Sequence, residues 1–356
     1  MTTVSTKSPQ KTTKLSFKPK QVVRHLLDSL SDRARDVITR RYGLDEKAER
    51  MTLESIGKKY GITRERVRQI ENHALGAIRK SKEYLKEKAI FNELRDAIKA
   101  LGGIVAEEDL LNHFAKDDST KNHVHFMLVI GEHFTREKED DHFKHRWYVD
   151  KDLADKIHSS LKKLYSELED DDLIAEPDMI ESFLEYIKEV ADEYKDDEVV
   201  KRWLSVSHRI AKNPLGEWGK IESPNIKAKG MRDYAFLVIR KHGSPIHFRE
   251  VAKAISEYFN KKAHVATTHN ELIKDDRFVL VGRGLYALKE WGYMSGVVKD
   301  VIKKLIEKHG PMVRDKVVEK VLKERYVKEN TILVNLQNPK YFYKDKEGKY
   351  HNIDEK

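Results

Sequence analysis

The stretch TLESIGKKYGITRERVRQIE, residues 52–71, decides the fold of the N-terminal part of this chain. Thr52 and Thr63 each precede apolar residues at helical spacing, which is typical of residues that cap the start of a helix. Between them, Gly61 can adopt the left-handed conformation that ends a helix, and Gly57 allows two crossing helices to approach closely. The stretch therefore predicts a short helix, a tight turn and a longer second helix, which is the helix-turn-helix motif.

The second of these predicted helices has one apolar face and one polar face. Val67 and Ile70 begin the apolar face, which continues through Ala74, Leu75 and Ile78. The opposite side carries charged and amide side chains: Arg64, Glu65, Arg68, Gln69 and Asn72. Arginine can donate to guanine, glutamine can pair with adenine, and glutamate can accept from cytosine. This face therefore predicts base contacts in duplex DNA; the alternative, an ordinary solvated face, accounts neither for the two glycines nor for the basic surroundings.

Two more helices are expected before the motif. Apolar residues recur at helical spacing from Val22 to Leu30, and Ser31 then caps a second helix that Gly43 ends. Residues 1–20 mix Thr, Ser, Lys and Pro without periodicity, so we expect a disordered basic arm there.

The charge is unevenly distributed along the chain. Residues 1–88 hold 22 Lys and Arg against 11 Asp and Glu, a net charge of +11, while the whole chain carries +9. An excess of this kind is typical of proteins that contact the phosphates of nucleic acid, although a solvated basic surface is the alternative. Residues 165–200 hold 15 acidic residues and two lysines, and we interpret them as a solvated helical spacer that repels DNA.

Composition excludes several kinds of protein. The chain has no cysteine, which excludes disulfides, thiolate metal sites and cysteine nucleophiles. No apolar run approaches the ~20 residues that span a bilayer, so we expect a cytoplasmic, nucleoid-associated protein with no membrane partner.

Three local patterns have simpler explanations than a functional site. The sequence GRG at residues 282–284 lacks the third glycine and the following helix of a nucleotide-binding loop. Asp345, Glu347 and Lys349 lie in a predicted hairpin turn. Several histidines have no accompanying carboxylate-histidine motif: His123, His125, His133, His142 and His145. We therefore expect no metal, no other cofactor and no enzymatic activity.

One order of elements occurs three times further along the chain. Each copy begins with a helix stopped by glycine, continues with two more helices and ends with two strands; the copies span residues 91–149, 234–288 and 297–353. Three helices followed by a hairpin predict a winged helix. Between the first two copies, residues 213–219 are rich in Pro and Gly, which predicts a linker.

Three sequences within residues 30–80 carry a family resemblance: RRYGL (40–44), TLESIG (52–57) and TRERVRQIE (63–71). They resemble region 4 of the bacterial primary sigma factors. In that family the second helix of the motif enters the major groove of the promoter −35 element. The resemblance implies base contacts for Arg64, Glu65 and Gln69. It implies phosphate contacts for a second set, namely Thr63, Arg66, Arg68, Arg40 and Arg41. It also implies docking on the flap of the RNA polymerase β subunit.

A second resemblance involves residues 231–291, through PIHFREVA (245–252) and FVLVGRGLYAL (278–288). These residues look like the HARE-type helix-turn-helix, a winged helix that is also similar to the N-terminal domain of the polymerase delta subunit. The first and third copies are assigned by element order. Nothing in the chain resembles sigma region 2, which in that family holds polymerase and melts the −10 element.

The predicted fold class is mainly α: a sigma region 4-like helix-turn-helix, about three small α+β winged helices and an acidic helical linker. The predicted domains are a disordered arm (1–20), the sigma region 4-like domain (21–88), a winged helix (89–150), the acidic helical segment and linker (151–229), the HARE-type winged helix (230–292) and a last winged helix (293–356).

The expected function is transcription regulation through sequence-specific binding of duplex DNA at a promoter −35-like element, with the RNA polymerase core, through its β flap, as a second partner. Two alternatives stay open. The chain could be a delta-like polymerase accessory protein that acts without sequence recognition, or the winged helices could be the DNA-targeting arm of a restriction or modification system. No catalytic motif supports the latter.

Overall fold

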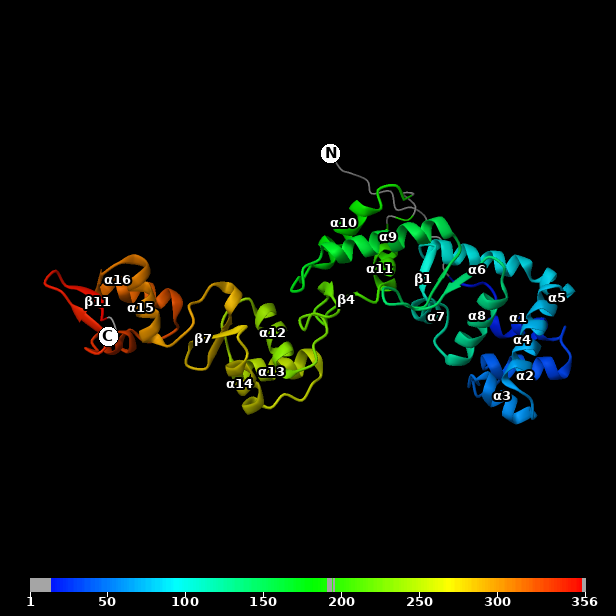
Figure 1. Ribbon diagram of the computed structural model, residues 1–356, viewed down its shortest axis with the longest axis horizontal. Helices are drawn as coiled ribbons and strands as arrows, with labels where there is room; N and C mark the ends of the chain where they lie inside the picture. Colours follow the sequence, from blue (N-terminus) through cyan, green and yellow to red (C-terminus); the bar gives the residue numbers. More distant parts are fainter. Residues whose placement is uncertain (1–13, 191–193, 195, 354–356) are drawn as a thin grey trace. The chain divides into compact units, whose positions relative to one another are not determined.

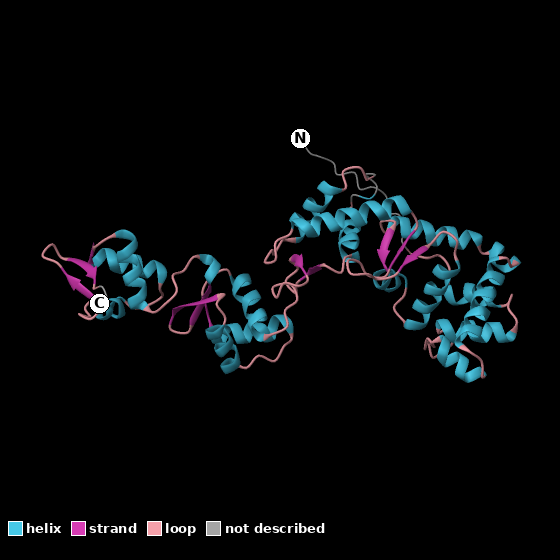
Figure 2. Ribbon diagram, in the orientation of Figure 1, coloured by secondary structure: helices cyan, strands magenta, loops and turns pink. Residues whose placement is uncertain are grey.

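The computed structural model describes residues 14–190, 194 and 196–353. It is mainly helical, with small antiparallel sheets (Figure 2). The chain divides into two compact units. The first holds the described residues up to Ala211 together with Trp218–Ile221, and the second holds Lys212–Glu217 and the described residues from Glu222. Each unit is described by itself.

The first unit begins with five helices, shown in blue in Figure 1: α1 (Pro19–Leu27), α2 (Asp32–Tyr42), α3 (Leu53–Tyr60), α4 (Arg64–Arg79) and α5 (Lys82–Lys86). The helix-turn-helix prediction is confirmed at α3 and α4. Thr52 and Thr63 cap the two helices with their side chains, and Gly61 ends α3 in the left-handed conformation.

The first copy follows directly as α6 (Lys88–Ala100), β1 (Ile104–Ala106), α7 (Glu107–Phe114), α8 (Asp118–Ile130), β2 (Thr135–Glu137) and β3 (Arg146–Tyr148). The three strands form an antiparallel sheet in the order β1-β3-β2. The three-residue strand β1 was not predicted, because so short a run has no detectable period.

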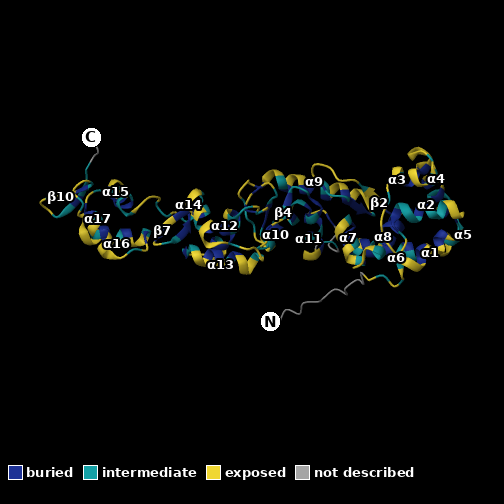
Figure 3. Ribbon diagram, turned by 90° about the horizontal axis from the view of Figure 1, so that it is seen from below, coloured by how far each residue is buried: buried dark blue, intermediate teal, exposed yellow. Residues whose placement is uncertain are grey.

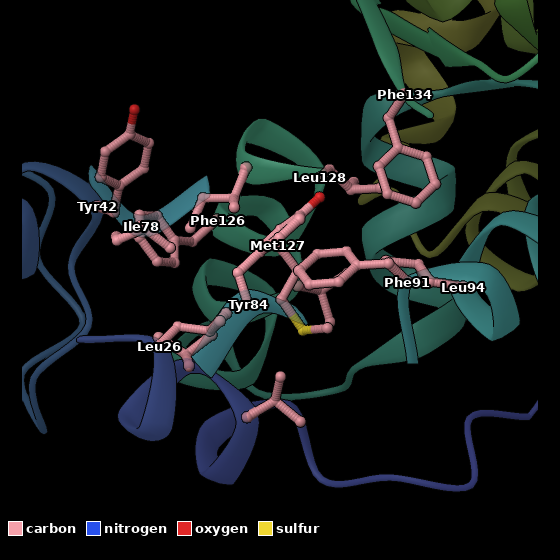
Figure 4. Packing of buried hydrophobic residues seen from close by; sticks show 14 of the residues in the cluster. Leu26, Tyr42, Ile78, Tyr84, Phe91, Leu94, Phe126, Met127, Leu128 and Phe134 are labelled. Carbon is pink, nitrogen blue, oxygen red and sulfur yellow. The ribbon is translucent and has the colours of Figure 1, made fainter. Parts of the chain in front are cut away.

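Side chains from both sides of residue 88 share one hydrophobic core. Tyr42 and Ile78 of the helix-turn-helix part lie beside Phe126 of α8 (Figure 4), and the rings of Tyr42 and Phe126 are 5.0 Å apart. Leu26 of α1 and Phe91 of α6 belong to the same cluster. The helix-turn-helix part is therefore built onto the first copy.

The acidic segment is not a solvated spacer, contrary to our interpretation. Its helices α9 (Lys151–Glu167), α10 (Glu176–Tyr186) and α11 (Asp197–Val206) bury apolar residues in a second core. Trp203 is fully buried and its Nε1 donates to the carbonyl of Gly102 at 2.9 Å. Acidic residues occupy the outer faces of these helices, and apolar residues recur between them in the sequence. The net charge of the segment therefore gave no indication that it forms a core.

The stretch interpreted as a linker forms the turn of a hairpin between β4 (Ile210–Lys212) and β5 (Trp218–Lys220). Asn213 orders this turn: its Oδ1 accepts from the amides of Leu215 and Glu217 at 2.9 and 3.0 Å. Pro and Gly here therefore mark a tight turn, at the point where the chain passes from one unit to the other.

The second unit contains the other two copies. The second copy comprises α12 (Met231–His242), β6 (Ile246–His247), α13 (Phe248–Phe259), α14 (Val265–Lys274), β7 (Phe278–Gly282) and β8 (Leu285–Leu288). The third comprises α15 (Val298–His309), β9 (Met312–Val313), α16 (Arg314–Glu324), α17 (Glu329–Leu336), β10 (Phe342–Lys344) and β11 (Lys349–Asn352). In every copy the short first strand pairs with the last strand, which lies in the centre of the sheet. The predicted helix and hairpin order is present in all three copies.

The second and third copies are joined by hydrogen bonds. The amide of Tyr326 donates to the carbonyl of Val281 at 2.7 Å, and the amide of Met294 donates to Glu324 at 3.0 Å. Gly282 is needed at this junction, because a Cβ there would lie 2.8 Å from the carbonyl oxygen of Tyr326. Among the described residues, no helix is long and apolar enough to cross a membrane.

Candidate nucleic-acid interface

The turn between α3 and α4 is held by close packing and by two caps. A Cβ on Gly57 would lie 2.7 Å from the carbonyl oxygen of Ile62, so only glycine permits this crossing. The Thr63 hydroxyl accepts from the amide of Arg66 at 3.2 Å and satisfies one free amide at the start of α4. Ile56 and Val67 are fully buried beneath the turn. The start of α4 is thereby fixed with its polar face outward.

The predicted DNA-contacting side chains of α4 are all exposed: Arg64, Glu65, Arg66, Arg68 and Gln69. Glu65 accepts two hydrogen bonds from Arg68, at 2.9 and 2.7 Å, and this arginine lowers the pKa of Glu65. Arg66 donates to Gln69 at 3.0 Å. Exposed pairs of this kind are weak, so they can exchange for contacts with DNA. Arg64 lies close enough to Glu65 to help lower the pKa of that carboxyl, and it forms no hydrogen bond or ion pair with another described residue.

A shallow depression lies between α3 and the start of α4. Its lining includes Glu54, Lys58, Thr63, Arg64 and Arg66, and Glu54 pairs with Lys58 at 2.9 Å. The amides at the start of α4 point towards this end, and a helix N-terminus attracts negative charge. Arg64 and Arg66 together with these amides suit a backbone phosphate of DNA, while Lys58 is held by Glu54. Lys58 also lines this surface. The sequence did not single it out, because α3 lacks the row of polar side chains that marks α4.

Arg40 and Arg41 lie apart from this face and have partners within the protein. Arg40 donates to Asp36 at 2.7 Å. Arg41 forms an ion pair with the buried Glu71 of α4 at 3.4 Å and donates to the carbonyl of Met51 at 3.2 Å. The Tyr42 hydroxyl also donates to Glu71, at 3.0 Å, and burial raises the pKa of this tyrosine. The contacts of Arg41 and Tyr42 with Glu71 hold α2 against α4.

Asn122 of α8 connects the helix-turn-helix part to the first copy, and sequence reasoning missed it. Its Nδ2 donates to the carbonyls of Gly43 and Ala48 at 3.0 and 2.9 Å, and its Oδ1 accepts from Arg50 at 2.7 Å. Arg79, near the end of α4, donates to the last carbonyls of α8 at 2.8 and 2.9 Å. Such contacts join residues 50 or more positions apart, so no local pattern could reveal them.

A partly buried polar cluster lies beside this junction. Glu107 accepts two hydrogen bonds from Arg136, at 2.6 and 2.9 Å, and one from Trp147 Nε1 at 2.8 Å. His125 Nε2 lies 3.8 Å from Glu107. Burial, assisted by the positive charge of Arg50, lowers the pKa of His125 to about 4. Among the described residues, no group of three or more His, Asp or Glu side chains could hold a metal ion.

The acidic helices lie away from the predicted DNA-contacting face of α4. Within the first unit, α3 and α4 occupy one end, while α9 and α10 lie towards the other end, in both Figure 1 and Figure 3. The negative charge of α10 and its neighbours is therefore separated from the predicted DNA contacts by the first copy.

Comparison with known proteins identifies the class of this helix-turn-helix. Residues 26–80 match the family Sigma-70, region 4, so α2 to α4 belong to a DNA-binding domain of the sigma factor class. Over 50 residues the chain is 52% identical to the RNA polymerase principal sigma factor HrdD of Streptomyces griseus. That alignment covers 14% of this chain and 15% of the relative, so the chain spans about a seventh of the relative's length. The sigma resemblance is confirmed for these residues, while the HARE-type assignment stays a prediction.

Proposed function

We propose that this protein is a sigma-like transcription factor whose α4 reads a −35-like element in duplex DNA. The observation that carries the proposal is the exposed face of α4, with Arg64, Glu65 and Gln69 side by side, within a Sigma-70 region 4 domain. The turn fixes the start of this helix, so a rigid element can present these side chains to the major groove.

Phosphate contacts would orient α4 on the duplex. Arg66, Arg68 and Thr63 at the start of α4 are the groups placed for this role. Arg41 acts less directly, because it holds α2 against α4 through Glu71, and Arg40 is engaged by Asp36 of its own helix. DNA binding of this kind would place the protein at the nucleoid.

RNA polymerase is the proposed protein partner, through the β flap, as the sigma resemblance implies. A delta-like accessory role is the second candidate. Among the described residues, ten of the eleven large hydrophobic side chains with high exposure lie in the second unit, and the remaining one is Leu85 of α5. Exposed apolar side chains favour contacts with protein. We propose that the three copies are winged helices, the second of them HARE-type, and that they supply part of these contacts.

Fluorescence anisotropy of the full chain tests the proposal. We expect tighter binding to a −35-containing duplex than to a scrambled duplex. Arg64→Ala should cost ~1–3 kcal/mol and relax selectivity at one base pair, whereas Arg66→Ala should weaken both duplexes alike. Lys151→Ala, an exposed cation on α9, is the control. Equal affinity for both duplexes, together with tight binding to core polymerase, would favour the accessory role instead.

A further inference from the structure

The three copies differ in what covers their sheets. In each sheet one face packs on the helices of its own copy, and we call the opposite face the outer sheet face. In the first copy this face carries Ile104, Ala106 and Tyr148, which are buried in the core formed with α9, α10 and α11. Neighbouring strand residues Val105 and Trp147 face the other way, into the first core.

The outer sheet face of the second copy is also covered. Val279, Val281 and Ala287 form a small cluster on which Trp291 and Tyr293, from the segment after the sheet, are packed. The third copy adds Tyr326, whose backbone pairs with β7 at Gly282. In the first and second copies the outer sheet face is therefore mainly aliphatic, and other segments of the same chain cover it.

The third copy presents a different outer sheet face. Tyr343 and His351 are directly opposite each other across β10 and β11, and Lys349 is opposite Val313. Alternation along the strands places these four residues on the side away from the core residues Phe342 and Tyr350. Tyr343 is 52% exposed and Val313 is 45% exposed. Two aromatic rings and a lysine thus replace the aliphatic residues of the other copies.

The rings on this face form a rigid aromatic pair. The rings of Tyr343 and His351 are stacked, with centroids 4.8 Å apart and an angle of 12° between their planes. Asp345 fixes the histidine through a 2.8 Å hydrogen bond to its Nε2. The ring pair is therefore held in place before any ligand arrives.

The third copy as a whole carries an excess of positive charge. Residues 298–353 hold 14 Lys and Arg against eight Asp and Glu. The acidic groups nearest the pair are engaged, since Asp345 bonds to His351 and Glu347 pairs with Lys349 at 2.8 Å. Lys346, in the turn between the two strands, is exposed and has no ion pair among the described residues.

We propose that the outer sheet face of the third copy binds single-stranded nucleic acid. An unpaired base stacks on the open face of the Tyr343 ring, whose other face is covered by His351, and Lys346 in the adjoining turn holds a neighbouring phosphate. Exposed aromatic rings within a positive surface are the usual means of binding single strands. A duplex keeps its bases stacked on one another, so it cannot use these rings. This site does not depend on the base-reading face of α4.

Binding of a fluorescein-labelled oligothymidine of about 12 nucleotides, within the usual site size, tests the proposal on the full chain. Tyr343→Ala should weaken binding by about tenfold, because one stacked base is lost. Tyr343→Phe should retain it. Tyr258→Ala is the matched control, since Tyr258 is equally exposed in the same unit, at 52%. Lys346→Gln should reduce the salt slope by roughly 0.7.

Two further measurements localise the effect. Arg64→Ala should leave oligothymidine binding unchanged, which separates this site from the proposed promoter contact. An oligonucleotide that carries 5-iodouracil should crosslink under ultraviolet light to the peptide that contains Tyr343. Unchanged affinity of a folded Tyr343→Ala variant, or crosslinking confined to the first unit, would overturn the proposal. A Tyr343-dependent preference for duplex DNA would overturn it as well.

Discussion

The third helix of the first copy and the third helix of the last copy have the same place in the element order but opposite surroundings. In α8, the seven consecutive residues Asn122–Leu128 are buried, because the helix-turn-helix part packs on one side and the first copy on the other. In α17, only Ile332 and Leu336 are buried. The comparison shows that the third helix of the first copy joins that copy to the helix-turn-helix part, a role that we call a brace. The third helix of the last copy instead leaves most of its surface exposed.

Phe126→Ala should give the largest effect, because this ring is fully buried at the centre of the brace. Removal of such a ring typically costs ~3–5 kcal/mol. Tryptophan fluorescence during urea unfolding measures it well, since three of the four tryptophans, Trp147, Trp203 and Trp218, are buried in the first unit. Affinity for the −35 duplex should fall in parallel. An unchanged midpoint would mean that α8 does not brace the helix-turn-helix.

Asn122→Ala should have a smaller effect of ~2–3 kcal/mol. The substitution leaves the carbonyls of Gly43 and Ala48 and the guanidinium of Arg50 without their partner, and unsatisfied buried groups are costly. The same fluorescence transition reports the loss, and hydrogen exchange should show faster exchange in α2 and α4. Asn335→Ala on α17 is the control, because that amide bonds only within its own helix. Equal losses in the two variants would contradict the brace.

Acid should destabilise the first unit through His125. Its pKa is about 4 in the folded protein and ~6.5 when unfolded, so the unfolded chain binds the proton more readily between these values. Stability is therefore full above pH ~6.5 and falls as the pH decreases towards 4, by up to ~1.4 kcal/mol per unit. His125→Gln should remove about half of this dependence in urea titrations at several pH values, because burial also lowers the pKa of His158 to about 4 in the same unit; the exposed His142→Gln should leave it unchanged. A dependence that His125→Gln does not reduce would assign the effect to other groups.

Much of the helix-turn-helix could be predicted from sequence because its determinants are local. Thr52, Thr63, Gly57 and Gly61 each act within a few residues, and the structure has both caps and the left-handed turn. The exposed face of α4 follows from the period of the helix, which Val67 anchors in the core.

What sequence could not reveal depends on distant partners. Arg41 looked like a phosphate ligand but has Glu71 beside it, 30 positions away, and Asn122 looked like an ordinary helix residue. The acidic helices were misinterpreted for a related reason: burial of Trp203 against Gly102 joins segments about 100 residues apart. Tertiary contacts of this kind override local charge and period.

Val334→Ala should give the smallest effect and is the sharpest test of the contrast between α8 and α17. Val334 is 62% exposed on α17, so its truncation should change stability by less than ~0.5 kcal/mol. Ile332→Ala, a fully buried neighbour on the same helix, should cost ~2–5 kcal/mol and shows that the measurement detects unfolding of the third copy. Thermal unfolding followed by circular dichroism compares the two. A loss above 1 kcal/mol for Val334→Ala would mean that α17 is covered as α8 is, and the two third helices would then have the same role.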